Sequence, residues 1–193
     1  MRSFLLGEKT EVQDLPYDYE VEYIEGTGIQ YVGVVVNVPV DAQYEFRVRA
    51  MPTASGAGWL LASGSGSFGR QGPAVYGPKW YIAAVTIDTN NPIDITLNND
   101  GSWYGGVQKI DGSFVDAGAT RNITMMCRSD LSATYRFIGR VYGLEIDLNG
   151  ALVRKLVPCV KDGVPCFYDS VSKTFYNDLS GEGFISGPRK EVA

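Results

Sequence analysis

The segment Leu144-Glu-Ile-Asp-Leu-Asn-Gly-Ala-Leu-Val-Arg-Lys155 decides the fold of this 193-residue chain. Asn149-Gly150 at its centre is the dipeptide most typical of a type I′ turn, whose twist fits the flanking strands of a β-hairpin. Apolar and polar residues alternate on both sides of the turn, as expected for strands with one buried face. The sequence therefore predicts an antiparallel hairpin over residues 144–155.

The turn also predicts which residues face each other across this hairpin. A two-residue loop pairs Ile146 with Val153, which suits a buried face. It pairs Glu145 with Arg154, and these opposite charges suit a solvated face. Both faces agree in one register, which strengthens the prediction of the hairpin.

A second turn, Asp162-Gly163, predicts another hairpin directly after the first. It places Cys159 opposite Cys166, and such neighbours have Cα atoms about 4.5–5.5 Å apart, within reach of a disulfide. Two small buried thiols are the other interpretation. With Cys127 the chain has three cysteines, too few for a disulfide scaffold. Both interpretations of the cysteine pair stay open.

Further strand-like segments follow one another along most of the chain, and no segment shows a long helical period. Tyr17 to Ile24 and Gln43 to Met51 alternate with a period of two, and turns recur every 8–12 residues or so. This pattern is typical of an all-β fold, a two-sheet antiparallel β-sandwich. We expect an N-terminal arm over residues 1–16, a single domain over 17–188 and a tail over 189–193.

Composition and charge exclude several classes of function. The chain has no histidine, which excludes Ser-His-Asp and Cys-His nucleophile pairs and histidine-ligated zinc. Its net charge of −5 argues against nucleic acid or an anionic membrane as the partner. The apolar run Phe4-Leu5-Leu6 is shorter than a secretory signal requires, so we expect synthesis in a cytoplasm.

Two parts of the sequence resemble a known group of domains. Residues 22–31 (EYIEGTGIQY) resemble the opening of concanavalin A-like, laminin-G-like jelly-roll domains. Residues 139–159, followed by Phe167-Tyr-Asp169, Phe175-Tyr-Asn177 and Gly181-Glu-Gly-Phe184, resemble their end. Such domains are common in bacteriophage virion proteins and in surface proteins of gut bacteria. The resemblance implies a jelly roll of two antiparallel sheets and carries over no catalytic residue.

One carboxylate pattern invites comparison with enzymes. Glycoside hydrolases of this fold use a Glu-x-Asp-x-Glu strand, which puts three carboxylates on one face, two of them as nucleophile and acid. Here the series is Glu145, Asp147 and Asn149. An amide cannot donate and recover a proton, so we expect no enzyme activity and no catalytic residue.

Two other groups of residues are candidate binding sites. Trp103 and Tyr104 follow the polar turn that contains Asn99 and Asp100, so aromatic rings for sugar stacking adjoin hydrogen-bonding groups. A structural role in the core is the alternative for the aromatic residues. Asp88 and Asp94 lie in or beside turns rich in oxygen ligands, which makes calcium a weak candidate, and we expect no other cofactor.

These observations lead to two competing functions. The first is a noncatalytic bacteriophage virion protein, such as a capsid decoration, head fibre or tail component. It would reside in the virion and bind a partner virion protein, further copies of itself in a symmetric assembly, or a host-surface glycan. The alternative is a carbohydrate-binding module of a bacterial cell-surface or secreted protein for glycan utilisation.

Overall fold

The computed structural model describes residues 15–39, 41–54, 58–63, 66–71, 74–76, 82–83, 89–104, 107–111, 120–127, 131 and 136–191. For residues 59, 66–71, 74–76, 82–83, 102–104, 107–111 and 120–121 this covers the backbone alone. Every regular element in these ranges is a β-strand, and neighbouring strands are antiparallel, as the sequence predicts. The described residues contain no helix long and apolar enough to span a membrane.

The larger sheet holds eleven of the described strands. Eight of them follow one path, in the order β11 (Val107–Asp111), β10 (Gly101–Tyr104), β9 (Ile93–Asn98), β4 (Tyr44–Pro52), β13 (Ile138–Leu148), β14 (Ala151–Lys161), β15 (Val164–Asp169) and β16 (Thr174–Tyr176). Three short strands join this path at its side: β1 (Tyr19–Glu20) pairs with β14, β2 (Ile24–Thr27) pairs with β13, and β17 (Ile185–Ser186) pairs with β2.

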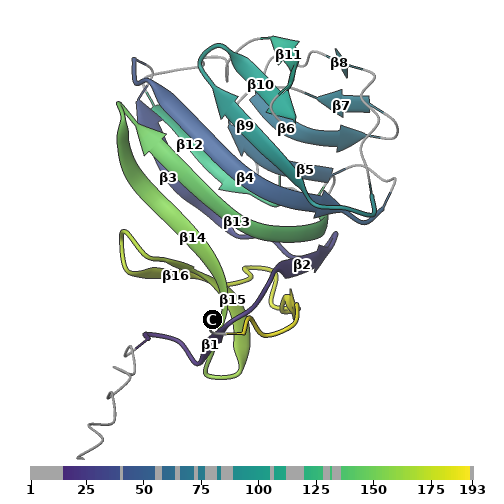
Figure 1. Ribbon diagram of the computed structural model, residues 1–193, viewed down its shortest axis with the longest axis vertical. Coiled ribbons are helices and arrows are strands. Elements are labelled where there is room, and N and C mark those ends of the chain that lie inside the picture. Colours follow the sequence, from purple (N-terminus) through teal and green to yellow (C-terminus); the bar gives the residue numbers. More distant parts are fainter. Residues whose placement is uncertain are drawn as a thin grey trace, which may run out of the picture.

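The smaller sheet has six described strands and lies behind the larger one (Figure 1). Their order is β3 (Gly33–Pro39), β12 (Thr120–Met125), β5 (Gly58–Ser63), β6 (Gly66–Gln71), β7 (Ala74–Tyr76) and β8 (Ile82–Ala83). In Figure 1, β14, β13, β4 and β9 cross in front of β3, β12 and β5, so the molecule is a two-sheet sandwich. The lower part of β14 extends below the sandwich and carries β15 and β1.

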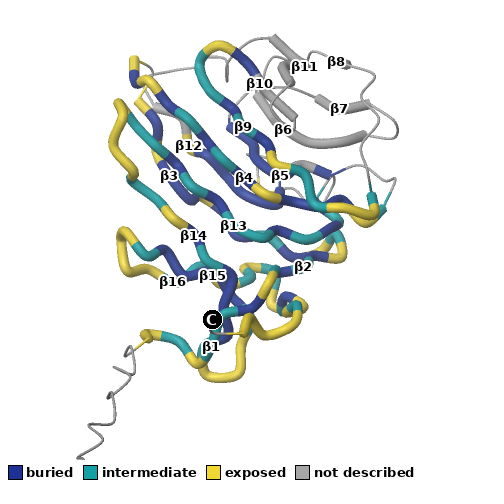
Figure 2. Tube along the Cα trace, in the orientation of Figure 1, coloured by how far each residue is buried: buried dark blue, intermediate teal, exposed yellow. Residues whose placement is uncertain are grey.

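The core lies between the sheets because each strand turns alternate side chains inward. Along β4, Phe46 and Val48 are buried, whereas Arg47 and Arg49 face outward, which confirms the period-two pattern in the sequence. The inner side chains join those of the smaller sheet, such as Leu61 and Ile123, in one apolar cluster. Figure 2 shows the buried stretches running along the middle of these strands. Burying each large apolar side chain contributes about 1.5–3 kcal/mol.

Both predicted hairpins are present, with the predicted turns. Asn149 and Gly150 have φ values of 51° and 79°, and Asp162 and Gly163 have values of 51° and 75°. A type I′ turn requires positive φ at both central positions, which Asn, Asp and Gly tolerate best. The turn residues of the sequence therefore determine where β13, β14 and β15 begin and end.

The predicted register of the first hairpin is wrong by one residue away from the turn. Ile146 pairs with Arg154 instead of Val153, and Glu145 pairs with Lys155 instead of Arg154. The cause is a β-bulge, in which Val153 is an extra residue on β14. The bulge moves Arg154 to the inner side of the sheet, opposite the buried Ile146.

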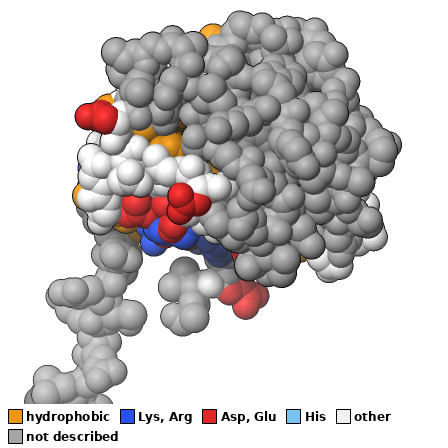
Figure 3. All heavy atoms as spheres, turned by 90° about the horizontal axis from the view of Figure 1, so that it is seen from above, with side chains coloured by type: hydrophobic (Ala, Val, Ile, Leu, Met, Phe, Trp, Pro, Cys, Tyr) orange, Lys and Arg blue, Asp and Glu red, His pale blue; other side chains and the backbone are white. Residues whose placement is uncertain are grey.

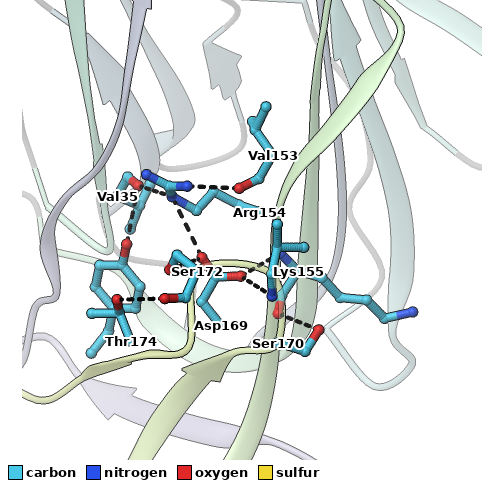
Figure 4. Close-up of polar contacts among 10 residues, drawn as sticks. Val35, Val153, Arg154, Lys155, Asp169, Ser170, Ser172 and Thr174 are labelled. Atoms are coloured by element: carbon cyan, nitrogen blue, oxygen red, sulfur yellow. Dashed lines mark hydrogen bonds and ion pairs between the residues drawn. The ribbon is translucent and has the colours of Figure 1, made fainter.

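Arg154 joins the two sheets through a polar contact at their edge (Figure 4). Its Nε donates a 3.0 Å hydrogen bond to the carbonyl oxygen of Val35 on β3, and the Tyr176 hydroxyl donates to the same oxygen over 3.3 Å. The same Nε lies 3.5 Å from Oδ2 of Asp169 on β15. We call Val35, Arg154, Asp169 and Tyr176 the inter-sheet cluster.

Asp169 is fully buried, and its carboxylate is satisfied by several donors. Its Oδ1 accepts the backbone N–H groups of Lys155 at 2.9 Å and Val171 at 3.0 Å. The Ser172 hydroxyl donates to Oδ2 over 2.5 Å. With Arg154 beside it, this buried charge has the partners that a stable structure requires.

The opening and closing segments of the chain, which carry the family resemblance, lie against each other. The buried Gln30 side chain accepts the Thr27 N–H at 2.8 Å and donates to the Gly183 carbonyl at 2.9 Å. Asp178 Oδ1 accepts the Tyr31 N–H at 3.0 Å. Burial opposes ionisation of Asp178, but this bond and those from the loop that follows lower its pKa below the ordinary value.

The contacts of the C-terminal segment continue past the predicted boundary at residue 188. Arg189 forms a β-bridge with Val21, and the Lys190 N–H donates to the Glu20 carbonyl at 3.0 Å. Residues 1–14, most of the predicted arm, lie outside the described residues.

Candidate functional site

The outer face of the larger sheet carries two adjoining pockets on strands β9, β4, β13 and β14. The first has a volume of about 400 Å³, and its charged lining residues are Arg47, Arg49, Asp94, Glu145, Lys155 and Lys190. The second has a volume of about 440 Å³, and its charged lining residues are Glu45, Arg47, Asp100 and Asp147. We call them the basic and acidic pockets, and together the outer-face groove. Charged side chains of both signs adjoin on this side of the molecule (Figure 3).

A second β-bulge shapes the basic pocket. On β13, Val141 pairs with Ala50 and Gly143 pairs with Arg49, so Tyr142 is an extra residue without a partner on β4. Val141 is buried, whereas Tyr142 and Gly143 both line the pocket. The bulge therefore gives two successive residues to the outer face, and bulges often redirect side chains in this way beside binding sites.

Arg47 holds the centre of the groove, where the two pockets meet. Its guanidinium lies 2.6 Å from Glu45, 3.1 Å from Glu145 and 2.5 Å from Asp147. Lys155 adds a 3.1 Å ion pair to Glu145. The hydrogen bond from Lys155 lowers the pKa of Glu145, and Arg47 lowers it further against the opposing effect of burial.

This arrangement is unsuited to acid catalysis by Glu145. A general acid needs a raised pKa, so that it still carries a proton at neutral pH, and the pKa of Glu145 is shifted the other way. Asn149, at the third position of the carboxylate series, is a turn residue whose Oδ1 accepts the Gln43 N–H at 2.9 Å. Its amide therefore fixes the turn beside β4.

Two of the predicted binding residues lie at the acidic end of the groove. Asn99 lines the acidic pocket, but its amide bonds to backbone: Oδ1 accepts the Tyr44 N–H at 2.8 Å, and Nδ2 donates to the Ala42 carbonyl at 3.2 Å. Asp100 is exposed and lines the same pocket. Asn99 thus has a structural role, and Asp100 remains open to a ligand.

Trp103 and Tyr104 lie on β10, beside β9. The backbone register pairs Trp103 with Thr96 and Tyr104 with Ile95, and both Thr96 and Ile95 line the basic pocket. The side chains of both aromatic residues lie outside the described part of the structure, so their stacking on sugar stays a prediction.

The calcium prediction gains no support from the described residues. Asp88 lies outside them, and Asp94 faces Arg49, with 3.8 Å between Oδ1 and Nη1. Within the part of the chain that the structure describes, no three His, Cys, Asp or Glu side chains form a group able to hold a metal ion.

Cys159 and Cys166 lie directly opposite each other, as the second turn predicts. Both are buried thiols, with 3.6 Å between their sulfur atoms. The hydrogen bond between the two thiols raises the pKa of Cys159, together with burial, and lowers the pKa of Cys166. The structure thus has the dithiol form, and a disulfide between these residues stays a prediction.

Sequence reasoning missed the central residues of the groove. The alternation over residues 43–51 places Arg47 and Arg49 on one face, but a charged face is ordinarily only a solvated one. Tyr142 gave no signal, because the bulge that brings it to the pocket is invisible in the sequence pattern. The other bulge brings Lys155 opposite Glu145, where the sequence pattern predicts Arg154.

No protein-family model matches this sequence, and no curated protein matches it.

Proposed function

We propose that the chain is a noncatalytic bacteriophage virion protein that binds a glycan in its outer-face groove. The observation that carries this proposal is a pair of pockets of about 400 and 440 Å³ on the outer face, which share Arg47 and are lined by charged and apolar side chains. A sugar hydroxyl both donates and accepts hydrogen bonds. The groove offers donors and acceptors side by side, with the Tyr142 ring among them.

The electrostatics of the groove support binding without catalysis. Glu145 and Asp147 are both paired with Arg47, and the pKa of Glu145 is lowered. A retaining or inverting glycosidase needs one carboxyl group that keeps its proton. The pair of Glu145 and Asn149 does not supply it.

The setting in a virion is supported by the sequence resemblance to laminin-G-like domains of bacteriophage proteins. In the structure, the residues that carry this resemblance form one unit, because Gln30 and Tyr31 bond to Gly183 and Asp178. A partner virion protein, or further copies of this chain, would then occupy surfaces other than the groove.

Glycan-array binding of the wild-type protein and of Trp103→Ala and Tyr104→Ala tests the glycan proposal. We expect binding by the wild type and a loss in both variants, because Trp103 and Tyr104 each pair with a residue that lines the basic pocket. The Tm of each variant separates lost binding from lost folding. Unchanged binding in Trp103→Ala refutes a role for Trp103, and no binding by the wild type refutes a glycan ligand.

Mass spectrometry of purified phage particles tests the virion setting, and stoichiometric copies are expected. Absence from particles, with glycan binding intact, would favour the carbohydrate-binding module instead. Hydrolysis of β-glucans that is lost in Glu145→Gln would overturn the noncatalytic proposal.

A further inference from the structure

The basic pocket has the opposite charge to the protein as a whole. The chain has a net charge of −5. The pocket is lined by four cations (Arg47, Arg49, Lys155 and Lys190) and two anions (Asp94 and Glu145), a balance of +2. The acidic pocket has one cation (Arg47) and three anions (Glu45, Asp100 and Asp147), a balance of −2. The groove is therefore electrically polarised along its length.

Among the pocket cations, Arg49 is the best placed to meet a ligand. Arg47 is held by three carboxylates at 2.5–3.1 Å. Among the described residues, Arg49 has one ion pair, at 3.8 Å from Asp94, which is longer than a hydrogen bond, and its side chain is 57% exposed. A guanidinium offers several donors in a plane and can bind a carboxylate with two of them at once.

The surroundings of Arg49 leave room for a sugar ring. Its partner across the sheet is Gly143, which has no side chain to cover the floor of the pocket. Next to Gly143, the bulge presents the ring of Tyr142. The Tyr23 ring packs edge-on against Tyr142, with 5.3 Å between the centroids, and so holds it in place. The Arg49 guanidinium, the uncovered backbone of Gly143 and the Tyr142 ring thus lie next to one another in the basic pocket.

We propose that the basic pocket is a subsite for an anionic sugar unit, and specifically for the carboxylate of a uronic acid. The carboxylate binds Arg49, and the apolar face of the sugar packs on Tyr142. The acidic pocket at the other end repels a second anion, so a single uronic acid unit of the oligosaccharide occupies the groove. This inference rests on the proposed glycan function.

Isothermal titration calorimetry with three probes tests the subsite. The probes are an oligogalacturonate, the same oligomer reduced to its neutral sugar, and a sulfated oligosaccharide of equal length. We expect the oligogalacturonate to bind tightest, and its affinity to fall as salt is added, since screening weakens exposed ion pairs.

Three variants identify the residues responsible. Arg49→Gln removes the charge-assisted bond, and we expect about tenfold weaker oligogalacturonate binding. Asp94→Asn removes the anion that competes for Arg49, and we expect binding about two- to fivefold tighter. A residue with only a structural role would not give this gain. Lys173→Gln, which removes an exposed charge outside the groove, is the control and should leave binding unchanged.

The possible results separate this inference from the function on which it rests. Equal binding of the neutral and acidic oligomers, or no effect of Arg49→Gln, overturns the subsite but leaves glycan binding standing. Tighter binding of the sulfated probe overturns the assignment to a carboxylate. Binding of none of the probes overturns the subsite, and an array without any hit then overturns the glycan function as well.

Discussion

Arg47 and Arg154 lie on opposite faces of the same sheet and both pair with carboxylates, but their surroundings differ. Arg47 is half-exposed in the outer-face groove, and its three acidic partners keep 20–39% of their side-chain surface exposed. Arg154 turns inward to Asp169, which has no exposed surface. Water competes for Arg47, Glu45 and Glu145, whereas Asp169 has no contact with water. Pairs of arginine and carboxylate therefore lie on a partly solvated surface in the outer-face groove and in a buried position in the inter-sheet cluster.

The largest expected effect on unfolding free energy comes from a substitution in the inter-sheet cluster. Asp169→Ala removes the carboxylate beside Arg154 and leaves the N–H groups of Lys155 and Val171 without their acceptor, and we expect a loss of about 3–5 kcal/mol in unfolding free energy. Urea unfolding measures it. The matched variant in the groove, Glu45→Ala, should lose less than about 1 kcal/mol, because Arg47 keeps two other partners. Equal losses in the two variants would contradict the distinction between the buried inter-sheet cluster and the partly solvated outer-face groove.

A smaller effect is expected from the Tyr176 hydroxyl, the second donor in the inter-sheet cluster. Tyr176→Phe removes the hydroxyl that bonds to the Val35 carbonyl, and we expect a loss of about 0.5–1.5 kcal/mol, again from urea unfolding. Tyr23→Phe is the control, since its ring contacts Tyr142 and Arg140 and the substitution keeps that ring. A Tyr176→Phe protein as stable as the wild type would show that Arg154 alone holds the sheets together here.

The smallest effect, and one that depends on pH, is expected in the groove. The lowered pKa of Glu145 stabilises the fold above the ordinary value of 4.5, and this contribution is lost as the pH falls through the lowered value. Glu145→Gln should therefore be slightly less stable than the wild type at neutral pH, by less than about 1 kcal/mol, and equal to it in acid. Unfolding curves at both pH values measure this. A difference that persists in acid would mean that Glu145 stabilises through packing instead of charge.

The turns of this fold can be predicted from sequence more reliably than its bulges. Asn149-Gly150 and Asp162-Gly163 carry their own backbone preference, so both hairpins and the pairing of Cys159 with Cys166 are predictable. The extra residues Val153 and Tyr142 have no such local signal. Their positions depend on partners distant in sequence, such as Val35 for Arg154.

The candidate site illustrates the same limit. The polar turn with Asn99 and Asp100 is legible in sequence and does lie at one end of the groove. The groove itself is formed by four strands, and only their register brings Arg49, Gly143 and Tyr142 together. The pattern within any single strand predicts only a charged, solvated face and does not predict a binding site.

The Val35 carbonyl has a consequence for copies of the chain that are held close together. Strand β3 is the terminal strand of the smaller sheet, and such strands readily recruit a foreign strand through unsatisfied backbone groups. Here Arg154 and Tyr176 already occupy one of those acceptors. Pro39, which has no N–H to donate, ends the strand. When many copies lie close together, the β3 edge would thus pair poorly with a strand of another copy, which disfavours edge-to-edge aggregation.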